Sequence, residues 1–120
     1  MTKKFLICLF FFFQIHFVYS HEKKFFLGAT VANTPKTIKQ QINYLDISGA
    51  IILKLIDRSP AKIGGLLVGD IILKIDDKEV NSFRDIIKYI SNYTGKGNVL
   101  IKVFRNDNIY DYSIKLDENS

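Results

Sequence analysis

The sequence is poor in the residues that most often carry covalent or metal chemistry. Its 120 residues include one cysteine, two histidines and no tryptophan. Cys8 and His16 both lie in an apolar N-terminal stretch, so His21 is the one imidazole beyond it. A nucleophilic site needs a base beside its Ser or Cys, and zinc or copper sites need further His or Cys ligands. We therefore expect a protein that is not an enzyme and holds no metal or cofactor.

The first twenty residues have the pattern of a secretory signal peptide. Lys3 and Lys4 precede the apolar run Phe5–Phe13, and Val18–Ser20 supplies small residues at the positions of a cleavage site after Ser20. As a helix, residues 5–19 would rise only about 22 Å against a hydrocarbon core of roughly 30 Å. We expect a periplasmic or secreted protein. The alternative is a membrane tether formed by the uncleaved segment.

The charge balance gives no sign of a nucleic-acid partner. The whole chain has 17 basic and 12 acidic side chains, a net charge of +5. Without Lys3 and Lys4 the net charge is +3, and the basic residues are scattered rather than clustered. We expect no nucleic-acid binding, and a membrane contact only if the signal is uncleaved.

The rest of the chain reads as one small domain without a Pro/Gly linker or an internal repeat. The predicted organisation is a signal peptide at 1–20, a short segment at 21–24, a domain at 25–116 and a frayed polar tail at 117–120.

Hydrophobic periodicity and turn residues predict a mainly β domain with two helices. Thr34 is placed to cap the first helix, with Pro35 at its first position. The predicted strands are 25–32, 50–56, 71–75 and 78–80, with a hairpin of 98–105 and 108–116. The predicted helices are one after Pro35 that ends at 48–49, a very short one within the turn segment 58–66 that glycine ends, and one at 83–92. This order fits a small antiparallel barrel or sandwich capped by α-helices.

One stretch carries a family signature. Residues 59–80 read SPAKIGGLLVGDIILKIDDKEV, which closely resembles the signature of bacterial PDZ domains of the HtrA-like type. Two positions depart from it. Gly64 stands where the family has alanine, and Asp77 stands at a turn glycine, where aspartate tolerates left-handed geometry better than most residues. The resemblance implies a PDZ-like fold.

The resemblance also implies a binding loop. PDZ domains bind peptides by β-strand addition, and backbone N–H groups of a glycine-containing loop hold the terminal carboxylate. The segment Phe26-Leu27-Gly28-Ala29 resembles that loop, and Gly28 would let the backbone approach the carboxylate. Thr30 and Val31, with Ala32, would then pair with the peptide. The alternative is an ordinary first strand with a bulge glycine.

The predicted helix at 83–92 would form the other wall of the groove. Ile86 is expected to face the core, whereas Ile87, Ile90 and Ser91 are candidates for lining the pocket. For each of these the alternative is core packing. A pocket lined by isoleucine favours an apolar last residue in the peptide.

The predicted function is therefore a non-catalytic peptide-binding or protein-binding module of the cell envelope or secreted space. The expected partners are peptide or protein C-termini with an apolar last residue. An envelope protease or a secretion component is a further candidate partner. The alternative is a structural or regulatory subunit of such a complex, whose groove edge pairs with a partner's strand. The chain's own end, Asp117–Ser120, is too polar to suit the pocket.

Overall fold

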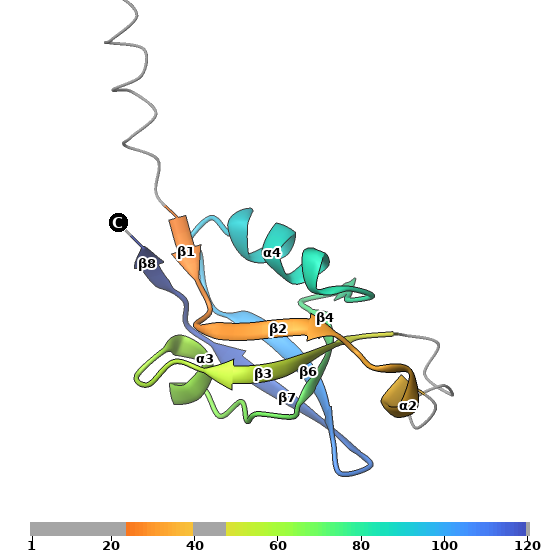
Figure 1. Cartoon of the computed structure of the whole chain (residues 1–120). Helices are drawn as coiled ribbons and strands as arrows, with labels where there is room; N and C mark the ends of the chain where they lie inside the picture. Colours follow the sequence, from red (N-terminus) through yellow and green to blue (C-terminus); the bar gives the residue numbers. More distant parts are fainter. Residues whose placement is uncertain (1–23, 40–47, 120) are drawn as a thin grey trace, which may run out of the picture.

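The computed structural model describes residues 24–39 and 48–119 (Figure 1). Its main sheet is antiparallel, with strand order β2-β3-β4-β6-β7 and the short β5 paired to β4, while β1 pairs with β8. The strands are β1 (Lys24–Phe26), β2 (Ala29–Asn33), β3 (Ala50–Leu55), β4 (Ile71–Ile75), β5 (Lys78–Glu79), β6 (Val99–Arg105), β7 (Asn108–Ile114) and β8 (Asp117–Asn119). The helices are α2 (Lys36–Lys39), α3 (Pro60–Ile63) and α4 (Phe83–Ser91).

Strand β4 is the centre of the core because both of its faces are buried. Ile72 and Ile75 belong to the main hydrophobic cluster, which includes residues of β3, β6, β7, α3 and α4. Ile71 and Leu73 point to the other face and pack in a smaller cluster with Phe104. This explains why β4 reads as a continuous apolar run rather than an alternating one.

Capping and turn residues explain where α3 begins and where the β6–β7 hairpin turns. The Ser59 hydroxyl accepts a hydrogen bond from Lys62 N at 3.3 Å, and Pro60 occupies the first turn of α3. Asn106 and Asp107 both have positive φ, which closes the β6–β7 hairpin. In the turn after β4 the residue with positive φ is Asp76, not Asp77 as the sequence predicts.

Helix α4 lies beside β2 (Figure 1). Hydrogen bonds to side chains surround its first turn. The Asp85 carboxylate accepts bonds from the N–H groups of Asn81 (2.8 Å) and Ser82 (3.3 Å). Phe83 N–H donates to the Asn33 amide oxygen at 2.9 Å. Because Asn33 is the last residue of β2, this bond fixes the start of the helix against the end of the strand.

The N-terminal strand and the C-terminal tail differ from the predictions. A break at residues 27–28 divides the predicted strand 25–32 into β1 and β2, because Gly28 has φ +86 and turns the chain. The predicted frayed tail contains β8, whose backbone pairs with β1 in the register Phe26 to Asp117. Backbone pairing thus orders residues that lack any apolar signal.

The first predicted helix is only partly testable. Helix α2 begins at Lys36, after Pro35, and residues 40–47 lie outside the described part of the chain. The predicted cap is wrong, because the buried Thr34 hydroxyl has no hydrogen-bond partner among the described residues. Ile38 packs against the smaller cluster, as a buried stripe requires.

Within residues 24–39 and 48–119, no helix is long and apolar enough to cross a membrane. Residues 1–23, which contain the predicted signal peptide, lie outside the described part of the chain.

Candidate binding groove

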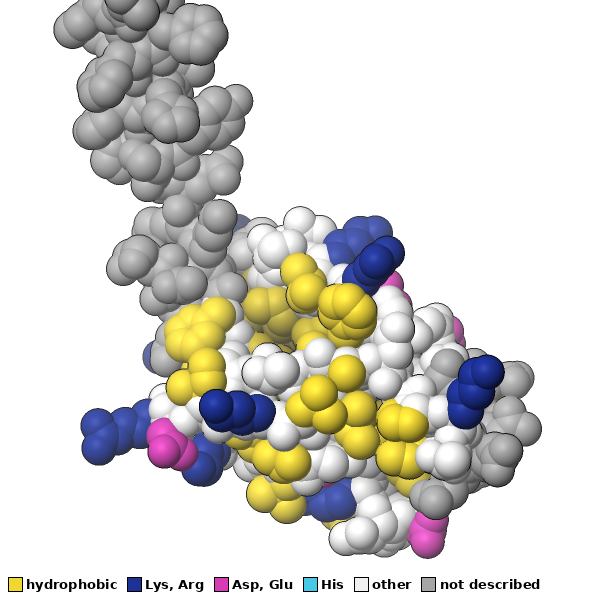
Figure 2. Space-filling model, viewed as in Figure 1, with side chains coloured by type: hydrophobic (Ala, Val, Ile, Leu, Met, Phe, Trp, Pro, Cys, Tyr) yellow, Lys and Arg dark blue, Asp and Glu magenta, His cyan; other side chains and the backbone are white. Residues whose placement is uncertain are grey.

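The candidate site lies along the unpaired edge of β2. In the main sheet β2 has a single neighbour, β3, so alternate N–H and C=O groups of β2 face away from the sheet. Helix α4 runs along that side (Figure 1). Figure 2 shows hydrophobic side chains gathered in a hollow between α4 and β2. An edge strand beside an apolar hollow is the arrangement that strand addition requires.

The loop before β2 points its amides away from the body of the domain. The carbonyl of Leu27 accepts a hydrogen bond from Ala61 N, and that of Gly28 accepts one from Ile56 N, both at 2.9 Å. In a trans peptide the N–H points opposite to the preceding C=O. The N–H of Gly28 therefore points away from α3, and the N–H of Ala29 points away from β3. Two neighbouring outward amides of this kind can hold an anion.

Glycine is required at position 28 for a reason that differs from the predicted one. A Cβ on Gly28 would lie 2.1 Å from the Cβ and 2.7 Å from the Oγ of Ser59, and φ is +86. Any side chain at this position would therefore run into the residue that caps α3, rather than into the path of a carboxylate. Gly28 shapes the loop by letting β2 begin in contact with α3.

The predicted residues of β2 lie along the edge with alternating exposure. Ala29 and Val31 are half-buried and pack against the main cluster, whereas Thr30 is exposed. A register shift between Thr30 and Val31 adds local twist to the strand. Leu27 is buried at 6 % exposure, so its side chain belongs to the core and only its backbone is part of the loop.

The predicted residues of α4 divide between groove and core. Ile87 is 59 % exposed, whereas Ile86 and Ile90 are 4 % and 6 % exposed and belong to the main cluster. Ile90 thus fits the core-packing alternative. Ser91 is exposed, and its hydroxyl donates to the Lys88 carbonyl at 2.9 Å.

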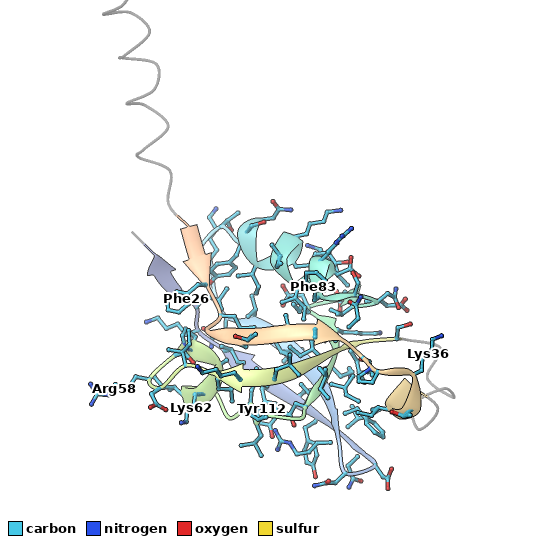
Figure 3. All side chains as sticks on the ribbon, in the orientation of Figure 1. Phe26, Lys36, Arg58, Lys62, Phe83 and Tyr112 are labelled. Carbon is cyan, nitrogen blue, oxygen red and sulfur yellow. The ribbon has the colours of Figure 1, made fainter. Side chains whose placement is uncertain are left out.

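Two aromatic side chains mark the ends of the groove. Figure 3 places Phe26 at the loop end of β2 and Phe83 where α4 begins. Both are half-buried. The loop pattern predicts Phe26, whereas the sequence assigns Phe83 only to the helix. Its helical spacing of four residues to Ile87 is the signal that could have placed it at the groove.

Contacts between distant segments are not predictable from the sequence. Ser59 packs behind Gly28, although the two are 31 residues apart in the sequence. The Asn33 side chain accepts a hydrogen bond from the first residue of α4, 50 residues further along the chain. Neither residue type indicates its partner in the sequence, so both contacts appear only once the sheet has formed.

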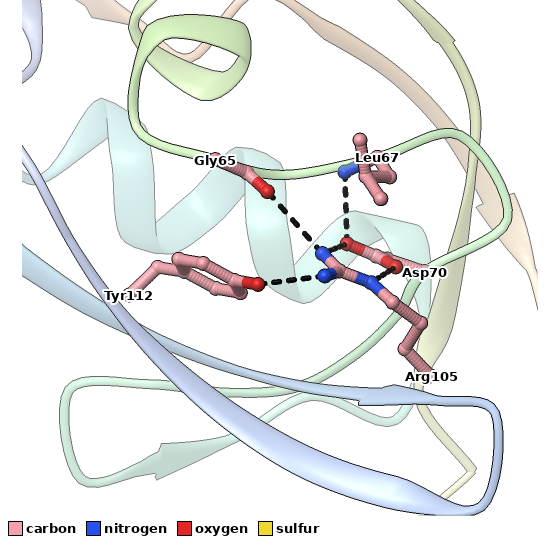
Figure 4. Close-up of polar contacts among 5 residues, drawn as sticks. All are labelled: Gly65, Leu67, Asp70, Arg105 and Tyr112. Carbon is pink, nitrogen blue, oxygen red and sulfur yellow. Dashed lines mark hydrogen bonds and ion pairs between the residues drawn. The ribbon is translucent and has the colours of Figure 1, made fainter.

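A buried ion pair forms a second polar cluster (Figure 4). The Arg105 guanidinium donates to both carboxylate oxygens of Asp70 at 2.6 Å, and also to the Tyr112 hydroxyl at 2.7 Å and the Gly65 carbonyl at 3.2 Å. Asp70 also accepts a bond from Leu67 N at 2.9 Å. The hydrogen bonds to Asp70 raise the pKa of Arg105 above its already high value. This cluster joins the loop before β4 to the β6–β7 hairpin and serves the fold.

The part of the chain that the structure describes contains no group of three or more His, Cys, Asp or Glu side chains that could hold a metal ion. The outward N–H groups of the loop are hydrogen-bond donors, so they suit an anion rather than a cation.

The family comparison identifies the domain. The model of the PDZ domain family matches residues 25–116, and the chain belongs to this family. It is 28 % identical over 91 residues to a probable periplasmic serine endoprotease, DegP-like, of Bartonella henselae, covering 76 % of this chain and 18 % of that protein. It is also 28 % identical over 81 residues to the serine endoprotease DegS of Haemophilus influenzae, covering 68 % of this chain and 24 % of that protein. The match therefore spans about a quarter or less of each relative.

Solved structures give the same fold. The PDZ domain of HtrA3 bound to the phage-derived ligand FGRWV superposes with a TM-score of 0.66 at 19 % identity, over 82 % of this chain and 89 % of that one. The HtrA-type protease AlgW, as its S227A variant with a decapeptide, superposes with a TM-score of 0.77 at 21 % identity, over 90 % of this chain and 33 % of that one. The predicted PDZ-like fold of the HtrA type is confirmed.

Proposed function

We propose that this domain binds the C-terminus of a peptide or protein by adding it as a strand to the free edge of β2. The observation that carries the proposal is the direction of the Gly28 and Ala29 amides, which follows from the bonded carbonyls of Leu27 and Gly28. A carboxylate at that point would accept hydrogen bonds from both N–H groups, and the rest of the peptide would pair along β2. In HtrA3 and AlgW, structures with peptide ligands are known for the same fold.

The apolar hollow favours a peptide that ends in Val, Ile or Leu. Ile87 is exposed. Ile86 and Ile90 face the core and Tyr89 turns toward β5, so the helical period places Ile87 on the β2 side of α4. Burying one such terminal side chain contributes roughly 1.5 to 3 kcal/mol. Ordering a short peptide offsets much of this gain, so we expect dissociation constants near micromolar, about −8 kcal/mol.

The domain acts as a binding module without catalysis, in the periplasm or the secreted space. Its protease relatives are named as periplasmic or serine endoproteases, and the region they share with this chain is the PDZ domain. A partner protein that offers an unpaired strand in place of a peptide end would use the same edge of β2. The domain would then act as a structural or regulatory subunit of an envelope protease or secretion complex.

Ile87→Ala is expected to weaken binding of a peptide ending in valine about fivefold to thirtyfold, because several methylene groups leave the wall of the hollow. Fluorescence anisotropy with the purified domain measures the change. Ile109→Ala is the matched control, since Ile109 is 44 % exposed on β7, a strand at the opposite edge of the sheet. Equal affinities of the two variants and the wild type would place the peptide elsewhere.

A further inference from the structure

We infer that the groove selects peptides with acidic residues before their apolar end. This inference rests on the proposed function and names the class of peptide. Basic side chains flank the path that an added strand would take: Lys54 on the outer face of the sheet, opposite Thr30, and Arg84 in the first turn of α4. Figure 2 shows Lys and Arg side chains at α4 and over the sheet on the same face as the hollow.

Lys54 lies where alternate side chains of an added strand would pass. It pairs directly with Thr30 across β2 and β3, and both residues are exposed on the outer face of the sheet. Side chains of a strand alternate between its two faces. When the terminal side chain of a peptide points toward α4, the side chain before it points to the outer face, beside Thr30 and within reach of Lys54.

Arg84 lies beyond Ile87 on the same side of the helix, whereas Lys88 lies on the side opposite the core. Residues 86 and 90 face the core, and Tyr89 turns toward β5, where its hydroxyl donates to the Glu79 carbonyl. At 100° per residue, Ile87 then lies on the side opposite Tyr89, toward β2, and Arg84 lies next to it on its solvent side. The Arg84 guanidinium stays close to the groove, 5.9 Å from the centre of the Phe83 ring.

The carboxylates on this face are already engaged. Asp85 accepts hydrogen bonds from backbone N–H groups at the start of α4. Asp57 is paired with Lys62, which lowers the pKa of its exposed carboxyl. In contrast, Lys54 and Arg84 form no ion pair with any described residue. An incoming peptide therefore meets basic groups that lack counter-charges within the described part of the chain.

Each exposed pair of charges strengthens binding by only about 1.4-fold to fivefold. Two such pairs together give about a twofold to twenty-five-fold preference for an acidic peptide over a neutral one. Because these charges are exposed, salt screens them. The ratio of the affinities for the acidic and the neutral peptide should therefore approach one at high ionic strength. Binding of the apolar end and of the carboxylate should persist.

The test compares three octapeptides that all end in valine and differ only at the residues one and three before it, which are Glu, Gln or Lys. Anisotropy titrations at about 50 mM and about 500 mM NaCl should rank them Glu, Gln, Lys in affinity at low salt, with the ranking compressed at high salt. Lys54→Glu should reduce the difference in affinity between the Glu and Lys peptides, because the residues one and three before the valine point to the outer face on which Lys54 lies. Lys78→Glu is the matched control, because Lys78 lies on the Tyr89 side of α4, 5.2 Å from that ring.

The outcomes separate the two proposals. Equal affinities for the three peptides, with the Ile87→Ala effect intact, would overturn the charge selection and leave the proposed function standing. If Lys78→Glu reduced the affinity difference between the Glu and Lys peptides as much as Lys54→Glu does, the charge selection would also be overturned. The difference would then depend on the net charge of the domain alone. Failure of every peptide to bind at millimolar concentration would overturn both proposals.

Discussion

Arg105→Met is expected to lower the free energy of unfolding by about 3 to 5 kcal/mol, because it leaves a buried carboxylate without its partner. The Asp70 side chain is 1 % exposed, and two 2.6 Å bonds from Arg105 satisfy its oxygens. Methionine approximates the length of the arginine stem but supplies no donor. Urea denaturation followed by circular dichroism measures the loss.

Lys102→Met is the matched control for this prediction. Lys102 pairs with Asp111 on the same hairpin, but the two side chains are 35 % and 49 % exposed. Such a pair contributes about 0 to 1 kcal/mol. If Arg105→Met cost no more than Lys102→Met, the buried pair would not hold the β4 loop to the hairpin.

Gly28→Ala is expected to cost about 2 to 4 kcal/mol of stability, because two penalties add. The left-handed backbone disfavours any side chain by about 1 to 2 kcal/mol. The added Cβ would also lie 2.1 Å from the Cβ of Ser59, so the loop or α3 must move. The measurement is again the midpoint of urea denaturation.

Gly69→Ala separates the two contributions to that loss. Gly69 also has positive φ, +94, but a Cβ added there would have no atom within 4 Å. Only the backbone strain remains at this position, about 1 to 2 kcal/mol. Equal losses for the two variants would show that the contact between Gly28 and Ser59 does not constrain the loop. For the same reason, substitutions at Gly28 are poor tests of binding, and Ile87 is a better one.

The signature of residues 59–80 is sufficient to predict the fold because it consists of local features. Pro60 begins α3, glycines permit left-handed turns, and the apolar run 71–75 fills both faces of one strand. Each of these features depends only on residues a few positions apart, so the sequence alone predicts the local structure. Strand β8 escapes prediction because its order comes from backbone pairing with β1, which leaves no hydrophobic pattern.

The candidate groove is predictable only in part. The segment Phe26-Leu27-Gly28-Ala29 connects β1 to β2 and Ile87 is exposed, and the part of both in binding a peptide stays a prediction. Ile90 faces the core, since periodicity alone does not divide a helix surface between core and groove. The role of Ser59 behind Gly28 depends on tertiary contact, which a linear pattern does not encode.

The central claim is that the amides of Gly28 and Ala29 hold a peptide carboxylate at the free edge of β2. It is tested most directly by ¹⁵N-resolved NMR titration with two peptides of the same sequence, one ending in a free valine carboxylate and one amidated. We predict that the free peptide shifts the amide signals of Gly28 and Ala29 most, with further shifts along β2 and around Ile87. Amidation should weaken binding about tenfold or more, because the charged hydrogen bonds are lost. Equal affinity for both peptides, or shifts confined to the β7 edge, would contradict the claim.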